Sequence, residues 1–267
     1  MAIISIRDLV VEYDGRHILN GLNLDVEQGE TMVLLGGSGS GKSTLLRHIL
    51  GLERPKSGSV IVKGTDMARC SASELKQLRR SIGVAFQSAA LFNSLSVEDN
   101  IALTLREHTR LAPSIIEIIV WMKLAAVGLA DFGKLQPQEL SGGMKKRAAV
   151  ARALALDPEI LVFDEPSAGL DPIVAAELDE LILLLKEAFQ ITVIVVTHEL
   201  ASAFRIADRI AMLYNGTFSA IGSKNEIKAS TSPQVRQFLD RIPENPAKAL
   251  AIADYFEKYL RSPEVNS

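Results

Sequence analysis

The hydrophobic pattern of this 267-residue chain predicts short strands separated by helices. Apolar positions roughly alternate over residues 3–11, and short apolar runs follow at 31–35, 59–62, 82–86, 160–163, 191–196 and 209–214. The middle runs are apolar on both faces, which is typical of parallel strands that helices cover on each side. The predicted fold class is therefore α/β, with a mostly parallel central sheet.

Helix boundaries are marked by capping residues at two places. Ser71 and Glu74 have the spacing of a capping box, in which each side chain bonds the other residue's backbone N–H. Asp171 followed by Pro172 offers an N-cap and a first-turn proline. A long helix is therefore predicted over 172–189.

Two further features set the limits of the sheet. Asn215-Gly216 stands between two apolar runs and is the dipeptide favoured by a type I′ hairpin turn. The sheet is therefore expected to end in an antiparallel ribbon. Residues 88–140 lack strand runs and carry amphipathic segments, so a helical insertion is predicted there.

The last 35 residues, 233–267, are predicted to form a helical C-terminal extension. Apolar residues recur at i, i+3, i+4 and i+7 in two stripes. The stripes are Val235, Phe238, Leu239 and Ile242, then Ile252, Tyr255, Phe256 and Tyr259. The pattern leaves open whether this tail packs on its own domain or reaches a second copy of the chain.

Composition narrows the class of protein. With 48% hydrophobic and 23% charged residues, a disordered or disulfide-stapled chain is excluded. The longest apolar stretch, 181–196, is interrupted by polar residues and falls short of the ~18–20 residues that span a bilayer. The single cysteine, Cys70, and the lack of a signal-peptide pattern favour a reducing cytoplasm. A net charge of -3 gives no electrostatic reason to bind nucleic acid.

A phosphate-binding loop is the strongest chemical signal. Residues 36–43 fit G-x-x-x-x-G-K-[ST] between an apolar run and a helix pattern. Glycines let successive backbone N–H groups point at phosphate oxygens, while Lys42 reaches the β- and γ-phosphates and Ser43 holds Mg²⁺. A glycine loop without a ligand is the alternative. The residues predicted to bind the nucleotide here are Gly36, Gly37, Ser38, Gly39, Ser40, Gly41, Lys42, Ser43 and Thr44.

Two acids and a histidine follow other apolar runs. Asp164 and Glu165 come after the run at 160–163, at the carboxyl edge where open α/β sheets bind ligands. Asp164 is predicted to support Mg²⁺, and Glu165 to deprotonate the attacking water. His198 ends another strand at the same edge and could donate to the γ-phosphate. The alternatives are acids that only cap the next turn and a structural histidine.

A second glycine-rich helix start is formed by Ser141, Gly142 and Gly143. It can hold a phosphate, yet one chain has no second nucleotide for it. A symmetric dimer would supply a nucleotide for this loop, because each loop then closes over the nucleotide held by the other subunit. A ligand-free glycine turn is the alternative.

These motifs together resemble the ATP-binding subunits of ABC transporters over residues 3–223. The resemblance implies an ABC-type P-loop fold in which 1–232 form the ATPase domain and 88–140 its helical subdomain, with an N-terminal antiparallel β-subdomain. It also implies that Tyr13 stacks on adenine and that Gln87 senses both Mg²⁺ and a permease. Gly37 departs from the proline that is common at its position.

The resemblance thus assigns roles to a defined set of residues. The catalytic set is Glu165, His198, Lys42 and Gln87, and the magnesium ligands are Ser43, Gln87 and Asp164. ATP contacts come from Tyr13, the phosphate loop, Ser141, Gly142, Gly143 and Asp171 of the D-loop.

Within this family, residues 86–92, 164–173 and 235–240 and Met144 look like the ATPases of Mla/Mce phospholipid transport systems. This implies a Mg²⁺-dependent ATPase homodimer on the cytoplasmic face of a bacterial inner membrane, bound to an MlaE-type permease. A periplasmic Mce-type lipid-binding protein and a small regulatory subunit would complete the complex, and the tail would be exchanged between subunits. The alternatives are the ATPase of a small-molecule importer and a soluble ABC ATPase acting on nucleic acid or ribosomes.

Overall fold

The structure is a computed structural model that describes residues 1–243. Its strands are β1 (Ala2–Tyr13), β2 (Arg16–Glu27), β3 (Thr31–Leu35), β4 (Ser57–Val62), β5 (Thr65–Asp66), β6 (Ile82–Ala85), β7 (Ile160–Asp164), β8 (Thr192–Thr197), β9 (Arg209–Tyr214) and β10 (Thr217–Ser223). Its α-helices are α1 (Lys42–Ile49), α2 (Ala72–Arg80), α3 (Val97–His108), α4 (Pro113–Ala126), α5 (Gly142–Ala153), α6 (Pro172–Phe189), α7 (Leu200–Ile206), α8 (Lys224–Ala229) and α9 (Pro233–Leu239). Two 3₁₀ turns, η1 (Ala130–Phe132) and η2 (Pro137–Glu139), connect α4 to α5.

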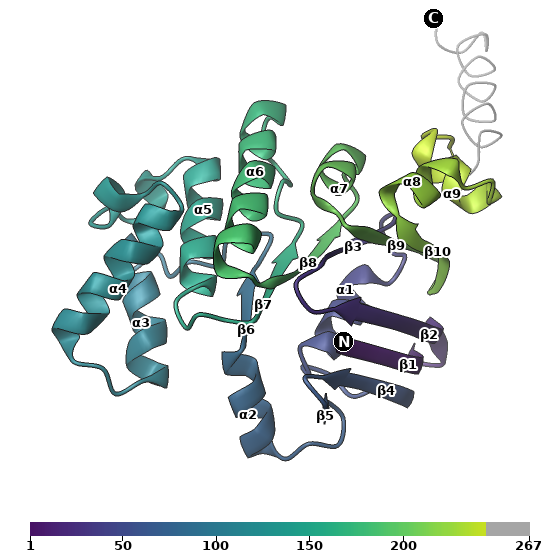
Figure 1. The fold of residues 1–267 in the computed structure, drawn as a ribbon, viewed down its shortest axis with the longest axis horizontal. Coiled ribbons are helices and arrows are strands. Elements are labelled where there is room, and N and C mark those ends of the chain that lie inside the picture. The colour runs from purple at the N-terminus through teal and green to yellow at the C-terminus, as the bar shows by residue number, and fades with distance from the viewer. Residues whose placement is uncertain (244–267) are drawn as a thin grey trace, which may run out of the picture.

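The strands form two sheets (Figure 1). The N-terminal sheet has the order β2-β1-β4-β5 and is antiparallel throughout. The central sheet has the order β10-β9-β3-β8-β7-β6, and only the β9–β10 pair in it is antiparallel. The predicted α/β class, with its parallel sheet and antiparallel N-terminal subdomain, is confirmed.

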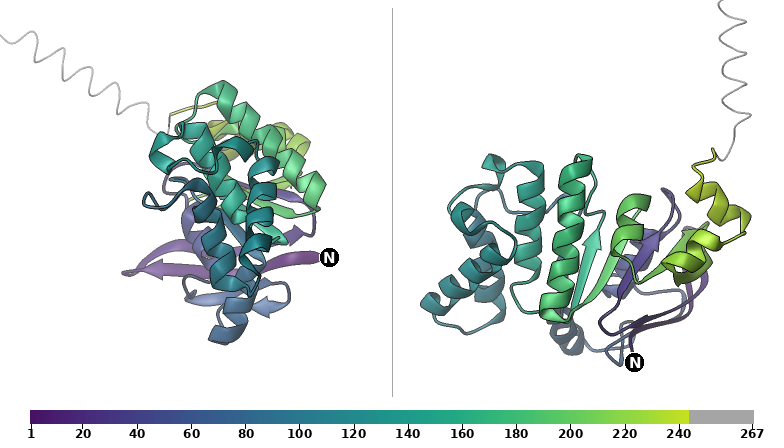
Figure 2. Two further views of the ribbon diagram at one scale, coloured as in Figure 1. Left: turned by 90° about the vertical axis from the view of Figure 1, so that its left-hand side faces the viewer. Right: turned by 45° about the horizontal axis from the view of Figure 1, so that its top comes forward.

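Alternate residues of the central strands face two hydrophobic cores. Val33 and Leu35 of β3 pack in the core that helices α3 to α7 build on one face. Met32 and Leu34 face the other core, which contains α1 and the N-terminal sheet. The same alternation recurs in β7, β8 and β9. Figures 1 and 2 show α3, α4 and α5 gathered at one end of the molecule and β1, β2 and β4 at the other.

Local sequence signals explain where several elements begin and turn. The Ser71 capping box starts α2, and the Asp171 carboxylate accepts from the N–H groups of Ile173 and Val174 at the start of α6. The predicted helix over 172–189 is confirmed. The hairpin between β9 and β10 is confirmed as well, with Asn215 and Gly216 both at positive φ, as a type I′ turn requires.

Two local expectations were incomplete or wrong. Strand β2 was not predicted, although its Leu22, Leu24 and Val26 alternate inward. Helix α5 starts at Gly142, as the glycine-rich helix start predicted, and Ser141 caps it so that the glycines lie inside its first turn. It was expected to continue to residue 156, but it ends at Ala153.

Residues 88–140 contain the helices α3 and α4 and no strand, but α4 is less amphipathic than expected. Ile116 and Val120 are buried, whereas Ile118 and Trp121 on the other side are 56% and 60% exposed. Helix α4 is therefore apolar around most of its circumference. Within residues 1–243, no helix is both long enough and apolar enough to cross a membrane.

The first stripe of the tail packs on the chain's own core. Val235 of α9 is fully buried, and Phe238 and Leu239 pack against the same cluster. Ile242 follows the end of the helix and is 53% exposed. The second stripe, Ile252, Tyr255, Phe256 and Tyr259, lies outside the described residues.

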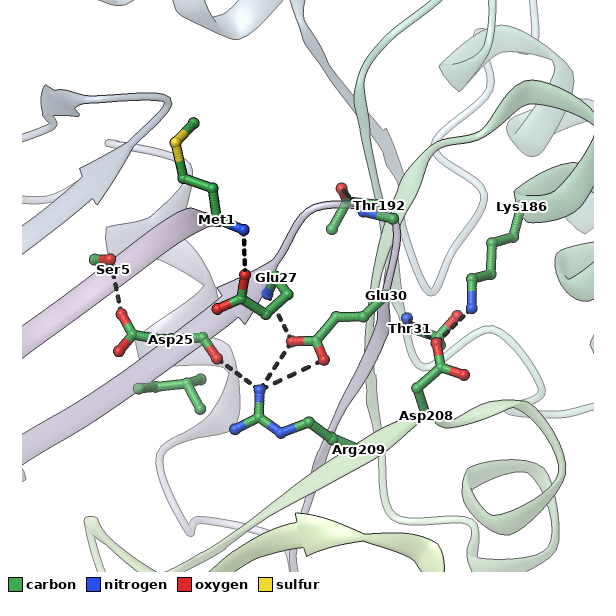
Figure 3. Close-up of polar contacts among 12 residues, drawn as sticks. Met1, Ser5, Asp25, Glu27, Glu30, Thr31, Lys186, Thr192, Asp208 and Arg209 are labelled. Carbon is green, nitrogen blue, oxygen red and sulfur yellow. Dashed lines mark hydrogen bonds and ion pairs between the residues drawn. The ribbon is translucent and has the colours of Figure 1, made fainter.

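A polar network joins the two sheets at the amino ends of β3 and β9 (Figure 3). The Arg209 guanidinium donates to the carbonyl of Asp25 at 3.0 Å and to the Glu30 carboxylate at 3.1 Å. Next to it, the Asp208 carboxylate accepts from the backbone N–H of Thr31 at 2.7 Å. This edge of the sheet is therefore fixed by contacts between strands that lie far apart in sequence.

Candidate functional site

The carboxyl ends of three adjacent strands meet at the opposite edge. Leu35 of β3 pairs with Thr197 of β8, and Asp164 of β7 pairs with Val196. The N–H of Glu165 donates to the carbonyl of Val196 at 2.8 Å and so extends the ladder by one residue. The loop that follows Leu35, the two acids and His198 therefore start side by side, as the sequence predicted.

The loop after β3 has the geometry of an anion-binding turn. A side chain at Gly36 would meet the carbonyl of Leu213 at 2.3 Å, and Gly39 and Gly41 lie at positive φ. No side chain caps α1, and its first turn carries no acid. The Ser40 hydroxyl is buried and has no hydrogen-bond partner among the described residues. An uncapped helix start beside an unpartnered hydroxyl fits a phosphate group.

Lys42 lies directly over this loop. Its ammonium donates to the carbonyls of Gly36 at 2.8 Å and Gly37 at 2.9 Å, and the residue is 7% exposed. Burial lowers the pKa of Lys42, and the nearby carboxylates of Glu165 and Asp164 oppose that shift. The side chain is thus placed to exchange carbonyl acceptors for phosphate oxygens.

Glu165 and His198 form a hydrogen-bonded pair. The Glu165 Oε2 lies 2.9 Å from His198 Nδ1 and accepts from the His198 backbone N–H at 3.4 Å. The Glu165 side chain is 13% exposed and the His198 side chain 55%. With Nδ1 on the carboxylate, only the doubly protonated imidazole can donate to Glu165 and to a phosphate oxygen at once.

Asp164 lies beside Gln87 in a cleft of about 700 Å³ that also includes Ala168 and Gly169. Burial raises the pKa of Asp164 and the Glu165 carboxylate adds to the effect, whereas the Lys42 and Lys146 ammonium groups oppose it. Asp164, Gln87 and Ser43 all offer oxygen atoms, the ligands that Mg²⁺ prefers. This donor set is compatible with a magnesium ion.

Tyr13 is linked to the helix that follows the phosphate loop. Tyr13 is the last residue of β1 and is 40% exposed. Its hydroxyl donates to the Glu53 carboxylate, which also pairs with Arg47 of α1 at 3.2 Å. Burial and the Glu53 carboxylate raise the pKa of Tyr13. An exposed aromatic face next to α1 can stack on a base.

The second glycine-rich loop does not meet the first one. Ser141 caps α5, with its hydroxyl accepting from the Met144 N–H at 3.3 Å, and a side chain at Gly143 would meet Val174 of α6 at 2.6 Å. None of the described residues lining the cavities at Ser38 and at Asp164 belongs to 141–143 or is Asp171. A single chain therefore leaves this loop apart from the phosphate loop.

Two cations of α5, Lys146 and Arg152, bond main-chain carbonyls next to the site and were not predicted from the sequence. The buried Lys146 ammonium donates to the main-chain carbonyls of Gln87 at 2.6 Å and Glu165 at 3.2 Å. Arg152 donates to the carbonyls of Ala89 and Ala90, and burial lowers the pKa of Arg152. The available signal was spacing, because Lys146 occupies the same helix face as the buried Ala149 and Val150 and the half-buried Ala153.

Sequence comparison relates the chain to known proteins. The family model described as "ABC transporter" matches residues 19–168. The probable ribonucleotide transport ATP-binding protein mkl of Mycobacterium leprae is 43% identical over 237 residues, covering 89% of this chain and 68% of that protein. The chain spans about two thirds of the length of such mycobacterial relatives. The intermembrane phospholipid transport system ATP-binding protein MlaF of Escherichia coli K12 is 41% identical over 244 residues, covering 91% of each.

The fold is also similar to that of a solved ATP-binding cassette structure. The post-hydrolysis dimer of the ATP-binding cassette MJ0796, bound to ADP and Pi, matches with a TM-score of 0.76 at 30% identity. The match covers 83% of this chain and 98% of that chain. The likeness supports the fold class derived from the strand order.

Proposed function

The chain belongs to the ABC transporter family, and from that membership we propose that it is the ATP-hydrolysing subunit of a transporter that moves phospholipid between two membranes. The observation that carries the ATPase assignment is the Glu165 carboxylate, which stands beside the phosphate loop with Asp164 and His198. Similarity to MlaF over 91% of both chains supports the lipid substrate.

In the proposed reaction, Lys42 binds the β- and γ-phosphates and the backbone of the loop orients them. Glu165 accepts the proton of the attacking water, and His198 donates to the γ-phosphate. Ser43, Gln87 and Asp164 would hold Mg²⁺, which when bound neutralises charge on the β- and γ-phosphates. Tyr13 stacks on the adenine.

Each catalytic site in this proposal is shared by two copies of the chain. Ser141, Gly142, Gly143 and Asp171 act on the nucleotide held by the partner subunit, since they do not line the cavities at the phosphate loop of their own chain. The dimeric MJ0796 cassette supports this arrangement. The ATPase domain is taken as 1–232 with its helical subdomain at 88–140.

The permease is proposed to dock in a cleft of about 680 Å³ between α2, the loop after β6 and α5. Exposed Phe86 and Phe92 line it together with Lys76, Arg79 and Arg80, and within residues 1–243 no carboxylate lines it. Lys76 and Arg80 have no ion-pair partner among the described residues. The docked segment is therefore acidic. An MlaE-type permease, with Mce-type and small regulatory subunits on the same complex, holds the ATPase at the membrane.

Ribonucleotide is the second candidate substrate, because the mkl relatives are 43% and 44% identical. The purified transporter in proteoliposomes is expected to move labelled phospholipid to acceptor vesicles only with ATP. Uptake of labelled ribonucleotide without lipid transfer would favour the second candidate. A Glu165→Gln transporter serves as the control for ATP-independent exchange.

Glu165→Gln is expected to lower the rate of phosphate release by about 10²–10⁴-fold while leaving ATP affinity unchanged, because the amide keeps the shape and loses the basicity. Steady-state phosphate release and calorimetry measure the two quantities. A rate within about tenfold of wild type would reject Glu165 as the base.

Mixing variants tests the shared site. Ser141→Arg blocks closure over the partner's nucleotide, and Lys42→Ala removes the charge that binds phosphate. In a heterodimer of the two, one site carries both defects and the other carries neither. One site is therefore expected to remain competent for ATP-dependent closure, measured by trapping of labelled ATP. Two equally impaired sites would mean that both motifs act within one chain.

Charge reversal tests the docking cleft. Lys76→Glu with Arg80→Glu is expected to weaken binding to the permease by roughly 10- to 100-fold, because like charges then face each other. ATP affinity of the isolated chain should not change. Arg16→Glu with Arg54→Glu, two exposed arginines outside the cleft, is the matched control. Equal effects of both pairs would contradict an acidic partner at this cleft.

A further inference from the structure

Lys146 carries a buried charge that has no ionic partner among the described residues. It is 9% exposed, and its ammonium bonds only main-chain carbonyls. Burying an ammonium without a counter-ion is costly, and a methionine of similar shape would fill the same space without that cost. Burial lowers the pKa of Lys146, while the Glu165 and Asp164 carboxylates oppose the shift. Packing alone therefore does not account for this lysine.

The two carbonyls belong to the two segments that the proposed reaction must align. One is that of Gln87, which follows β6, at 2.6 Å, and the other is that of Glu165, which follows β7, at 3.2 Å. A single nitrogen atom thus fixes the separation between the two main chains. No other described side chain donates to both.

Glu165 needs such support because its backbone is strained. Its φ is +47°, in the left-handed region that a non-glycine residue adopts only at an energetic cost. The N–H is held by Val196 and the carbonyl accepts from Ala168 N–H at 3.2 Å as well as from Lys146. Removing the Lys146 contact leaves the carbonyl with one donor from its own tight turn.

Helix α5 is the element that delivers this contact. It starts at the Ser141 cap, and six residues after Lys146 its Arg152 donates to the carbonyls of Ala89 and Ala90, which both lie at positive φ. The helix is therefore bonded to the loop after β6 at two places and to Glu165 at one. A shift of that loop moves an acceptor of the same ammonium that holds Glu165.

We propose that Lys146 is a positioning residue for ATP hydrolysis, which holds the main chains of Gln87 and Glu165 together so that the Glu165 carboxylate points at the attacking water. This inference rests on the proposed ATPase function. Lys146 itself touches neither nucleotide nor water in this role. Movement of the loop after β6 changes the orientation of the Glu165 carboxylate through Lys146, without changing nucleotide affinity.

The test is Lys146→Met in the full chain. The kcat for phosphate release is expected to fall about 10- to 100-fold, because a misplacement of ~1 Å in a catalytic group costs about 10²-fold. The KM and the dissociation constant for ATP, measured by calorimetry, should stay within about twofold of wild type. Lys146→Gln keeps a side-chain N–H donor and should show a smaller loss of kcat.

Lys123→Met is the matched control. Lys123 lies in the helical insertion and is also a buried lysine, but its ammonium pairs with Asp157 and lies over the Phe189 ring. The Lys123→Met substitution is expected to lower the melting temperature, but kcat should not change. Wild type that fails to hydrolyse ATP would overturn the proposed function instead of this inference.

Two results would overturn the inference while wild type is active. One is a Lys146→Met protein with kcat within about threefold of wild type, and the other is a parallel loss of kcat and ATP affinity. If Lys146→Met does not fold, the same split is measured on Lys146→Ala, which also removes the donor to both carbonyls. An unchanged kcat in that variant then overturns the proposal, and a lower kcat with unchanged affinity supports it.

Discussion

The parallel pairing of β3, β8 and β7 is the constraint on which the rest of the site depends. Because Leu35 is in register with Thr197 and Asp164 with Val196, three chain segments leave the sheet at one edge within a residue of each other. The bond from the Glu165 N–H to Val196 continues this register into the first loop residue. A slip of one position in either pair would turn every side chain of that strand to the other core and separate Glu165 from the phosphate loop.

The contacts at the amino ends of the central strands differ in kind from those at their carboxyl ends. At the amino end, Arg209, Glu30 and Asp208 tie strands and sheets together through charged contacts that leave little freedom (Figure 3). At the carboxyl end, Lys42 bonds the carbonyls of its own loop and Glu165 bonds His198. In the proposed reaction, Lys42 and His198 would exchange these partners for phosphate oxygens, whereas the contacts at the amino end would stay as they are.

Sequence could predict what depends on local order and on strand ends. The phosphate loop, Asp164, Glu165 and His198 each follow an apolar run directly, and carboxyl ends of parallel strands share an edge, so their meeting followed from the pattern. Lys146 could not be placed in this way, since its acceptors lie 59 and 19 residues away and are backbone atoms without a residue signature. The exposed side of α4 was missed for a related reason, because an apolar residue reads as core until the packing around it is known.

The separation of the two glycine-rich loops follows from how the halves of the chain are built. The phosphate loop is rooted in β3 and α1, between the two sheets, whereas Ser141 starts a helix that packs in the other core against α6. The central sheet lies between them, so no rotation of a side chain can bring Ser141 to its own phosphate loop. Helix α5, however, is bonded to the loop after β6 and to Glu165 through Lys146 and Arg152. In the proposed dimer, the element that would act on the partner's nucleotide is therefore the same element that bonds the main chain of Glu165 in its own subunit.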